Sequence, residues 1–262
     1  MADYETLEVG REDGVARIAF DRPESHNSLD EQMTGELADV AHDVVSDDDV
    51  RCIALTGNGS VFNTGADLTA LSGDGSDEPT LRTLAGGLHE FLSQLLRAPK
   101  PVVTGVNGVA AGGGLGPAIC GDVVLVGESA RLEFAYPRIG LSADGGSTYL
   151  LPRLVGLRRA QELVFRDEPV EADEAVEIGL ATEQVPDGDL DDRLEEEAAR
   201  LADGPTRAYA TTRRLLAESY GNSLDEQLAE EADGIAALTN TEDFSRGHAA
   251  FGGDEEPEFV GR

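Results

Sequence analysis

Short apolar stretches alternate with amphipathic segments along the first part of this chain, and this alternation narrows the possible folds more than any other feature. Because a hydrophobic period of two indicates a strand, strands are predicted at TLEVG, VARIAF and CIALTG and near residues 101–106, 122–126, 131–134 and 181–185. From Ser147 onward helical patterns dominate. Strand-helix units followed by helices predict an α/β fold with a helical C-terminal part.

Helix signals support this division of the chain. Ser28 or Asp30 can cap a helix running to about Ser46, and residues 99–101, a Pro-Lys-Pro sequence, end a helix that begins near Leu81. Residues 72–79 are rich in Gly, Asp and Ser, which predicts a mobile loop. The best internal boundary lies at residues 186–191, which gives a core over residues 1–190 and a helical oligomerisation region over residues 191–262.

Charge is the strongest compositional signal. The 262 residues include 52 acidic and 20 basic ones, for a formal net charge of −32, and Lys100 is the one lysine. Such a surface repels a phosphate backbone, which argues against nucleic-acid binding. The acidic residues are scattered rather than gathered in a tail, so we predict a heavily hydrated surface adapted to high intracellular salt.

Other features of the composition argue against several classes of protein. No apolar run approaches the roughly 20 residues that a membrane-spanning helix needs, and the N-terminus lacks a leader pattern, so a cytoplasmic protein is expected. Cys52 and Cys120 lie in apolar contexts and read as buried free thiols of a reducing compartment. The four histidines are too scattered for a metal site, and none is expected.

The segment GVAAGGGLG, residues 108–116, is the first candidate for chemistry. Three successive glycines after a strand let a substrate approach the backbone, and a helix beginning there would direct free N–H groups at it. That arrangement suits a phosphate or an oxyanion developing on a carbonyl, although close packing of a helix on a strand also explains it. No Gly-Lys-Ser/Thr follows, and no acidic residue ends the following strand, so nucleotide-binding loops do not fit.

Four further blocks accompany this segment in a fixed order. The five are DRPESHNSL (21–29), VFNTGADL (61–68), NGVAAGGGLG (107–116), IGLSADGGS (139–147) and LPRLVG (151–156). Together they resemble the enoyl-CoA hydratase/isomerase, or crotonase, superfamily from about residue 5 to the end of the chain. The resemblance implies a spiral of ββα units with a helical C-terminal trimerisation region, assembled as a homotrimer or a hexamer made of two trimers. It also implies an acyl-CoA thioester substrate, with coenzyme A as part of the substrate and no covalently bound cofactor.

The resemblance assigns site residues as well. The backbone N–H groups of Ala66 and Gly113 would form an oxyanion hole for the thioester oxygen, where one donor is typically worth about 3 kcal/mol. His26 would touch the nucleotide of coenzyme A, although an exposed loop histidine explains it equally well. The other residues expected to contact coenzyme A or the acyl group are Arg22, Ser28, Gly65, Asp67, Leu68, Val109, Gly112, Gly116 and Tyr136.

The sequence departs from the hydratases of this superfamily at their two glutamates. The matching positions here are Gly116 and Tyr136, and neither can act as a carboxylate, which argues against ordinary hydration. Glu128 is expected in an exposed turn, and Glu133 is expected to point away from its apolar neighbours, so neither is favoured as a replacement.

Asp144 is the carboxylate that remains. Its block resembles two branches of the superfamily: isomerases of the 1,2-epoxyphenylacetyl-CoA type, in which the matching aspartate moves a proton, and 4-chlorobenzoyl-CoA dehalogenase, in which it attacks the ring. The dehalogenase also has a histidine base matching His89 and a tryptophan where this chain has Tyr136. Residues 237–259 look like the isomerase and hydratase branches, so we favour proton transfer.

Several alternatives stay open at this stage. A hydratase with other acid and base groups, a dehalogenase and an acyl-CoA binder without activity each fit part of the pattern. Asp144 could instead cap a helix at Ser147, and His89 could be a half-buried structural histidine on its helix.

Overall fold

The computed structural model describes residues 4–253 and 256–262. Residues 1–3 and 254–255, parts of the N-terminal segment and of the C-terminal tail used above, lie outside the described residues. The strands are β1 (Leu7–Glu12), β2 (Val15–Phe20), β3 (Cys52–Gly57), β4 (Val61–Asn63), β5 (Val102–Val106), β6 (Val109–Ala111), β7 (Val123–Gly127), β8 (Arg131–Glu133), β9 (Val170–Glu171) and β10 (Glu183–Val185). The α-helices are α1 (Glu31–Ser46), α2 (Glu78–Arg97), α3 (Leu115–Ala118), α4 (Ser147–Leu154), α5 (Gly156–Arg166), α6 (Ala172–Glu177), α7 (Leu190–Ala202), α8 (Thr206–Glu218), α9 (Leu224–Leu238) and α10 (Glu242–Ala250).

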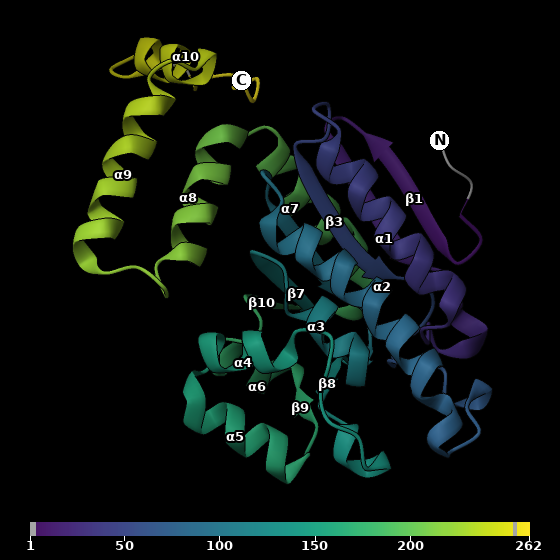
Figure 1. Ribbon diagram of the computed structural model, residues 1–262. Helices are drawn as coiled ribbons and strands as arrows, with labels where there is room; N and C mark the ends of the chain where they lie inside the picture. The colour runs from purple at the N-terminus through teal and green to yellow at the C-terminus, as the bar shows by residue number, and fades with distance from the viewer. Residues whose placement is uncertain (1–3, 254–255) are drawn as a thin grey trace.

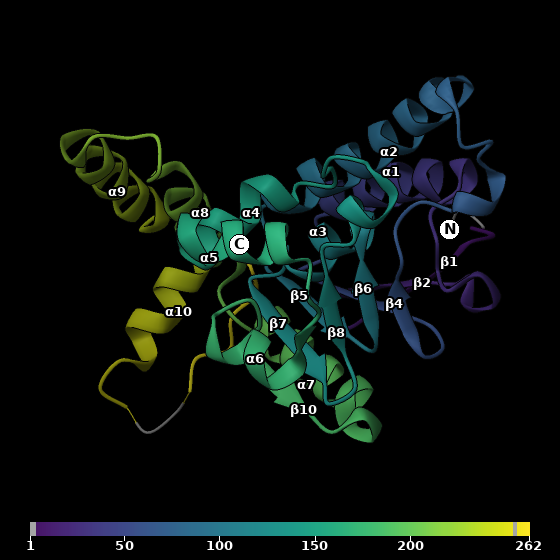
Figure 2. The same ribbon diagram turned by 90° about the horizontal axis from the view of Figure 1, so that it is seen from below.

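The element order confirms a spiral of ββα units. Pairs of strands precede each of α1, α2, α3 and α4. A six-stranded sheet has the order β1-β2-β3-β5-β7-β10, in which only β1 runs antiparallel to its neighbour. The second strands of the later units form a separate sheet, β4-β6-β8-β9, which is parallel except at β9. Figure 2 shows β4, β6 and β8 side by side below α1 and α2.

The six-stranded sheet is covered on both faces, so its central strands β3 and β5 are buried at every position rather than at alternate ones. On one face, Ile53 and Leu55 join the main core under α1 and α2. On the other face, Cys52 and Ala54 pack with residues of α7 such as Leu194. This two-sided burial explains why the stretch CIALTG has no polar residue facing solvent.

Most predicted elements are confirmed within small shifts of their ends. Asp30 is the N-cap of α1, where its carboxylate accepts a hydrogen bond from Met33 N at 2.8 Å. Helix α2 begins at Glu78, three residues before the prediction, because Pro79 suits the first turn of a helix. The predicted loop before it contains a 3-10 turn, Gly75–Asp77, closed by a capping box on Asp74. Its mobility stays a prediction. Strands β4, β6 and β9 were not predicted, because two or three residues are too few to show a period.

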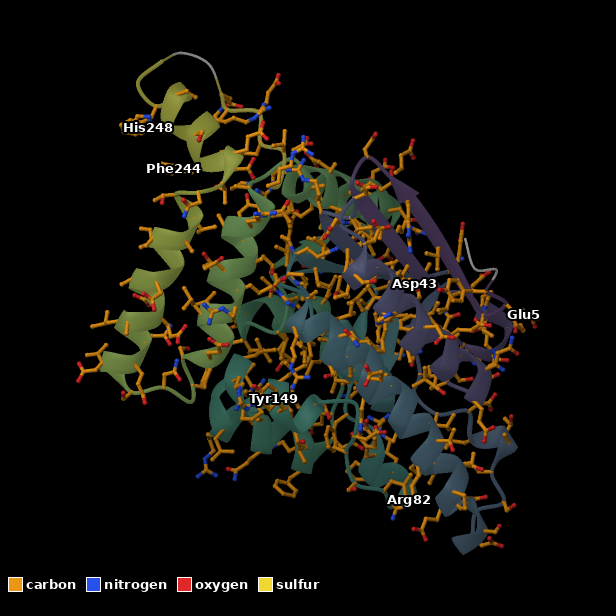
Figure 3. All side chains as sticks on the ribbon, turned by 45° about the horizontal axis from the view of Figure 1, so that its top comes forward. Glu5, Asp43, Arg82, Tyr149, Phe244 and His248 are labelled. Carbon is orange, nitrogen blue, oxygen red and sulfur yellow. The ribbon has the colours of Figure 1, made fainter. Side chains whose placement is uncertain are left out.

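The C-terminal helices divide into two groups. Helix α7 begins at Leu190 and still packs on β3 and β5. Helices α8, α9 and α10 form an arm that stands away from the sheets (Figure 1). The part of the chain that leaves the core therefore begins after α7. Phe244 and His248 lie on α10 at the far end of this arm (Figure 3), with ring centroids 6.0 Å apart.

Several compositional predictions can be compared with the described residues. Among the helices of residues 4–253 and 256–262, none is long and apolar enough to cross a bilayer. The same residues contain no cluster of three or more His, Cys, Asp or Glu side chains able to hold a metal ion. Cys52 and Cys120 are free and buried, and burial raises the pKa of each thiol to about 12.

Candidate active site

The site lies where three neighbouring parallel strands end. Strands β4, β6 and β8 are adjacent in the smaller sheet, and Ala66, Gly113 and Asp144 follow them in that order along the chain. The carboxyl ends of adjacent parallel strands open at one edge of a sheet, which is where α/β proteins bind ligands. Three segments separated by many residues in the sequence are thereby brought to one place.

The first donor, Ala66, sits in a turn held by Leu29. Leu29 N donates to Gly65 O at 2.8 Å, and Asp67 N donates to Leu29 O at 2.9 Å, so the two residues flanking Ala66 are both bonded. Within residues 4–253 and 256–262, the amide of Ala66 donates to no backbone oxygen outside the regular elements. The turn therefore presents the N–H group of Ala66, while hydrogen bonds to Leu29 fix Gly65 and Asp67 on either side of it.

The second donor, Gly113, lies in the first turn of the helical segment formed by the 3-10 turn Gly112–Gly114 and α3. The first N–H groups of a helix have no partner within it, so this amide is available. Gly65 packs directly on it: a Cβ atom added to Gly65 would lie 2.7 Å from Gly113 N, and Gly65 has a φ of +76°. Only glycine meets both conditions, and this contact brings the two predicted donors together.

Gly116 follows on the same helix, at the position that the family resemblance matches to one of the two hydratase glutamates. A Cβ atom at this position would lie 1.7 Å from the carbonyl oxygen of Gly145. The loop before α4 therefore occupies the space in which any side chain at residue 116 would begin. The absence of a carboxylate here is built into the packing, and a substitution of Gly116 alone cannot restore it.

Asp144 lies in that same loop and is half-buried. The hydroxyl of Tyr136 donates to Asp144 Oδ1 at 2.6 Å and approaches Asp144 O at 3.2 Å. Burial, and then the charge of Asp144, raise the pKa of the Tyr136 phenol, so it remains a proton donor. The alternative that Asp144 caps α4 does not hold, because the N-cap is Gly146, and it has no side-chain cap bond. The Tyr136 hydroxyl therefore holds Oδ1 of the Asp144 carboxylate and leaves Oδ2 without a hydrogen bond to Tyr136.

Ala135 directs Tyr136 into the site from the end of β8. Its φ is +62°, a left-handed conformation that is unfavourable for a residue with a Cβ atom. Its N–H group donates to Asp167 Oδ1 at 2.8 Å, and Arg138 bonds the same carboxylate. These contacts maintain the sharp turn that points Tyr136 towards Asp144.

His89, on α2, meets the same loop. Gly145 N donates to His89 Nε2 at 3.3 Å, which requires that this nitrogen carry no proton. The imidazole is exposed on its other side. His89 thus contacts Gly145, the residue after Asp144, through Nε2. Because His89 is exposed, the half-buried structural histidine that the sequence left open is not observed.

The residues of the block DRPESHNSL (21–29) mainly make hydrogen bonds and ion pairs within the chain. Arg22 donates to Ser28 O at 2.6 Å and pairs with Asp30 and Asp67 at 3.1 and 3.4 Å. A hydrogen bond from Thr69, with Arg22 contributing, lowers the pKa of the Asp67 carboxyl. The positive charge of the Arg22 guanidinium is thus balanced by the Asp30 and Asp67 carboxylates. His26 is exposed and has a left-handed backbone conformation, with φ +55°.

The remaining predicted contacts surround this centre. Val109 is half-buried at the start of β6, and Leu68 is 46% exposed beside the Ala66 turn. Of the two glutamates set aside above, Glu128 is exposed, as expected. Glu133 is buried, and it pairs with Arg138 and Arg131 rather than facing solvent.

The sequence reasoning missed one supporting residue, Asn63. Its side chain is fully buried and accepts a hydrogen bond from Gly65 N at 2.8 Å. The signal was present in the block VFNTGADL, where a short amide precedes a Thr-Gly turn, and Asn side chains commonly bond the backbone two residues on.

Taken together, the site offers two adjacent N–H donors, one oriented carboxylate and an imidazole. The two N–H donors can stabilise an enolate, and the carboxylate can move a proton.

Comparisons with known proteins identify the family to which the chain is similar. Residues 10–262 match the family model described as enoyl-CoA hydratase/isomerase. A "probable enoyl-CoA hydratase" of Rhodobacter capsulatus is 39% identical, over 99% of each chain. The 1,2-epoxyphenylacetyl-CoA isomerase of Escherichia coli is 35% identical, over 96% of this chain and 97% of its own. The crystal structure of an enoyl-CoA hydratase/isomerase from Cupriavidus metallidurans superposes with a TM-score of 0.90 at 30% identity, covering 100% of this chain and 98% of the other.

The chain belongs to the enoyl-CoA hydratase/isomerase family. The family, the fold and the processing of acyl-CoA thioesters expected from the sequence are thereby confirmed. The relatives carry both hydratase and isomerase names, so the choice between these reactions rests on the site itself.

Proposed function

We propose that this protein is an enoyl-CoA isomerase that moves a double bond by a proton shuttle on Asp144. The observation that carries the proposal is the packing of Gly145 against Gly116. The carbonyl of Gly145 fills the place of a hydratase carboxylate, while the adjacent residue of the same loop, Asp144, supplies a carboxylate of its own. Water addition needs both an activator and a proton donor, whereas a shuttle needs one group that accepts and then returns a proton.

The proposed reaction begins with a 3-enoyl-CoA whose thioester oxygen accepts hydrogen bonds from Ala66 N and Gly113 N. The C2–H bond breaks, the proton passes to the free oxygen of Asp144, and the electron pair is delocalised onto the thioester oxygen as a dienolate. The two amides stabilise that charge. Asp144 then returns the proton to C4 as the double bond forms between C2 and C3, and no external oxidant or co-reactant is needed.

Tyr136 and His89 support this step in the proposal. Tyr136 holds Oδ1 of Asp144, so that the second oxygen faces the substrate, and its buried phenol does not compete as a base. His89 accepts the Gly145 N–H group and so fixes the loop that carries Asp144. A hydrogen bond to a charged group contributes about 1.5–3 kcal/mol, enough to keep one carboxylate orientation dominant.

Two features of the surface extend the proposal beyond chemistry. Large apolar side chains are exposed on the arm; they are Leu216, Tyr220, Leu224, Leu228, Ile235, Phe244 and Phe251. Large exposed apolar side chains in this number on one arm favour an interface, which supports the homotrimer or hexamer expected from the family resemblance. The net charge of −32 supports function at high salt, where screening lowers repulsion between the protein and anionic coenzyme A.

The experiment that tests the proposed reaction offers the wild-type enzyme both regioisomers, a 3-enoyl-CoA and a 2-enoyl-CoA, in high KCl, with products identified by mass spectrometry and chromatography. Conversion of the 3-enoyl to the 2-enoyl form supports the isomerase. Addition of water to the 2-enoyl substrate as the faster reaction would establish a hydratase instead. Chloride release from 4-chlorobenzoyl-CoA would establish a dehalogenase, and binding without any turnover would indicate an inactive acyl-CoA binder.

A further inference from the structure

Asn63, the last residue of β4, contacts both halves of the proposed oxyanion hole. Its Oδ1 atom accepts the hydrogen bond from Gly65 N at 2.8 Å, in the turn that presents Ala66. The same Oδ1 atom and the backbone carbonyl of Asn63 also pack against Gly114, the residue after Gly113: a Cβ atom at Gly114 would lie 2.2 Å from Asn63 O and 2.7 Å from Asn63 Oδ1. One side chain therefore lies between the two segments that carry the donors.

The amide of Asn63 is itself fixed by a second buried amide, Asn27. Asn63 Nδ2 donates to Asn27 O at 2.6 Å. Asn27 has a left-handed backbone, and its side chain accepts from Arg22 N at 2.8 Å and donates to Val61 O at 2.7 Å. Both side chains are 0% exposed. A buried amide with both ends bonded has a single orientation, because turning it over would leave a donor and an acceptor unpaired.

We infer that Asn63 is a positioning residue that sets the separation and direction of the Ala66 and Gly113 N–H groups. This inference rests on the proposed function, because it assigns a role within the oxyanion hole of that site. Asn63 reaches the reacting atoms only through Gly65 and Gly114, so it touches no substrate. Electrostatic stabilisation depends on donors aimed where charge develops, and a displacement of about 1 Å can reduce a rate about 100-fold.

The test uses Asn63→Ala in the full chain, with Asn58→Ala as the matched control. Asn58 lies five residues before Asn63, and its side chain bonds Glu8 and Asp21 at the surface instead of the hole. The readout is the infrared carbonyl stretch of bound hexanoyl-CoA carrying ¹³C at the thioester carbon, because this frequency falls as the two N–H groups polarise the carbonyl. Turnover is not required, so the measurement is independent of which reaction the enzyme catalyses.

We expect the wild type and Asn58→Ala to lower the carbonyl frequency equally, and Asn63→Ala to lose most of the shift while hexanoyl-CoA stays bound. Isomerisation by Asn63→Ala should show a kcat about 10- to 100-fold lower, with KM changed far less. Asn63→Ser, which keeps a polar group in the cavity, is measured alongside, so a folding failure of the alanine variant leaves the test intact.

Two results would overturn the inference. An equal carbonyl shift in the wild type and in the Asn63 variants would show that the hole is positioned without this side chain, and would leave the proposed isomerase untouched. A wild-type complex without any shift would remove the oxyanion hole itself, and the role of Asn63 with it. A third outcome separates the two proposals. If the wild type shows the carbonyl shift but no isomerase activity, and Asn63→Ala loses the shift, the proposed reaction is rejected while the positioning role is supported.

Discussion

The hydroxyl group of Tyr136 donates a hydrogen bond to Oδ1 of Asp144 at 2.6 Å, across a turn that separates them by eight residues in the chain. The phenol is 7% exposed, while the carboxylate is half-buried at the edge of the site. The family resemblance matches Tyr136 to a hydratase glutamate, and in the proposed reaction Tyr136 instead orients the carboxylate of Asp144.

Removal of this hydrogen bond should slow catalysis without abolishing binding. Tyr136→Phe deletes only the hydroxyl, and a bond to a charged group is worth about 1.5–3 kcal/mol, so we expect kcat to fall about 10- to 100-fold. The KM for the acyl-CoA should change little. Steady-state kinetics with a 3-enoyl-CoA measure both constants, with Tyr149→Phe, on the exposed face of α4, as the control. Unchanged kcat in Tyr136→Phe would show that Asp144 needs no such orientation.

Tyr136 should also resist titration by alkali. Burial and the adjacent carboxylate raise its pKa above the ordinary value of 10.0, so the folded protein retains this proton where an unfolded chain loses it. Its contribution to stability is therefore complete below pH 10 and is lost as the pH rises towards the raised value. We expect the phenolate absorbance of the wild type and of Tyr136→Phe to match up to pH 11, while both remain folded. A wild-type excess of one phenolate would contradict the prediction.

Substitution of Gly116 should destabilise the fold and fail to create a hydratase. Because a Cβ atom would lie 1.7 Å from Gly145 O, Gly116→Ala must displace the loop of Asp144, at a cost of about 1–3 kcal/mol in the free energy of unfolding. Gly116→Glu should be at least as unstable and add no water to a 2-enoyl-CoA. Chemical denaturation and product analysis measure these outcomes.

The matched control for that substitution is Gly86→Ala on α2. Nothing lies within 4 Å of a Cβ atom there, and alanine favours a helix over glycine by about 1 kcal/mol. We expect the free energy of unfolding of Gly86→Ala to be equal to the wild-type value or higher. Equal stabilities of Gly116→Ala and Gly86→Ala would refute the account of the packing at Gly116.

Lys100 should be a structural residue despite being the one lysine of the chain. Its ammonium group is buried and donates to Val44 O and Asp47 O, at the C-terminal end of α1, at 3.0 and 2.7 Å. Burial lowers its pKa. Lys100→Met keeps the length of the side chain but leaves these carbonyls unpaired, which should cost about 1–3 kcal/mol of stability with no direct effect on kcat. A variant as stable as the wild type in thermal unfolding would reject this role.

Salt should stabilise the protein. Raising KCl from about 0.1 to about 1 M shortens the Debye length from about 10 Å to about 3 Å, which screens the repulsion among the excess acidic residues. We expect Tm to rise by several degrees over this range and the KM for acyl-CoA to fall. Sucrose of equal osmolality controls for effects other than charge. A Tm that stays constant or falls would argue against an adaptation to high salt.

Much of the fold was predictable because its signals are local. The capping carboxylate of Asp30, the turn after β1 and the largely apolar sequence of β3 each appear in a few consecutive residues. Strand β9 escaped prediction because its two residues pair with β8 through tertiary contact alone. The same limit applied to Glu133, whose burial depends on Arg138 and not on its own neighbours in the strand.

The residues of the candidate site could be proposed from the sequence, but the contacts between them could not. The glycine-rich segment and Asp144 could be named from motifs, whereas the bonds from Tyr136 to Asp144 and from Asn63 to Gly65 depend on distances that no spacing encodes. The reason for glycine at residue 116 also became visible only in three dimensions. Read as a one-dimensional pattern it was a lost glutamate, but in the fold it is a position that admits no side chain.

The most direct test of the central claim, that Asp144 carries the proton, compares wild-type and Asp144→Asn enzymes on a 3-enoyl-CoA in heavy water. Products are analysed by mass spectrometry, and calorimetry with hexanoyl-CoA confirms that both enzymes bind. We expect the wild type to form the 2-enoyl-CoA with deuterium incorporated, and Asp144→Asn to bind the thioester normally while turning over at least about 100-fold more slowly. Isomerisation by Asp144→Asn at a rate near that of the wild type would contradict the account.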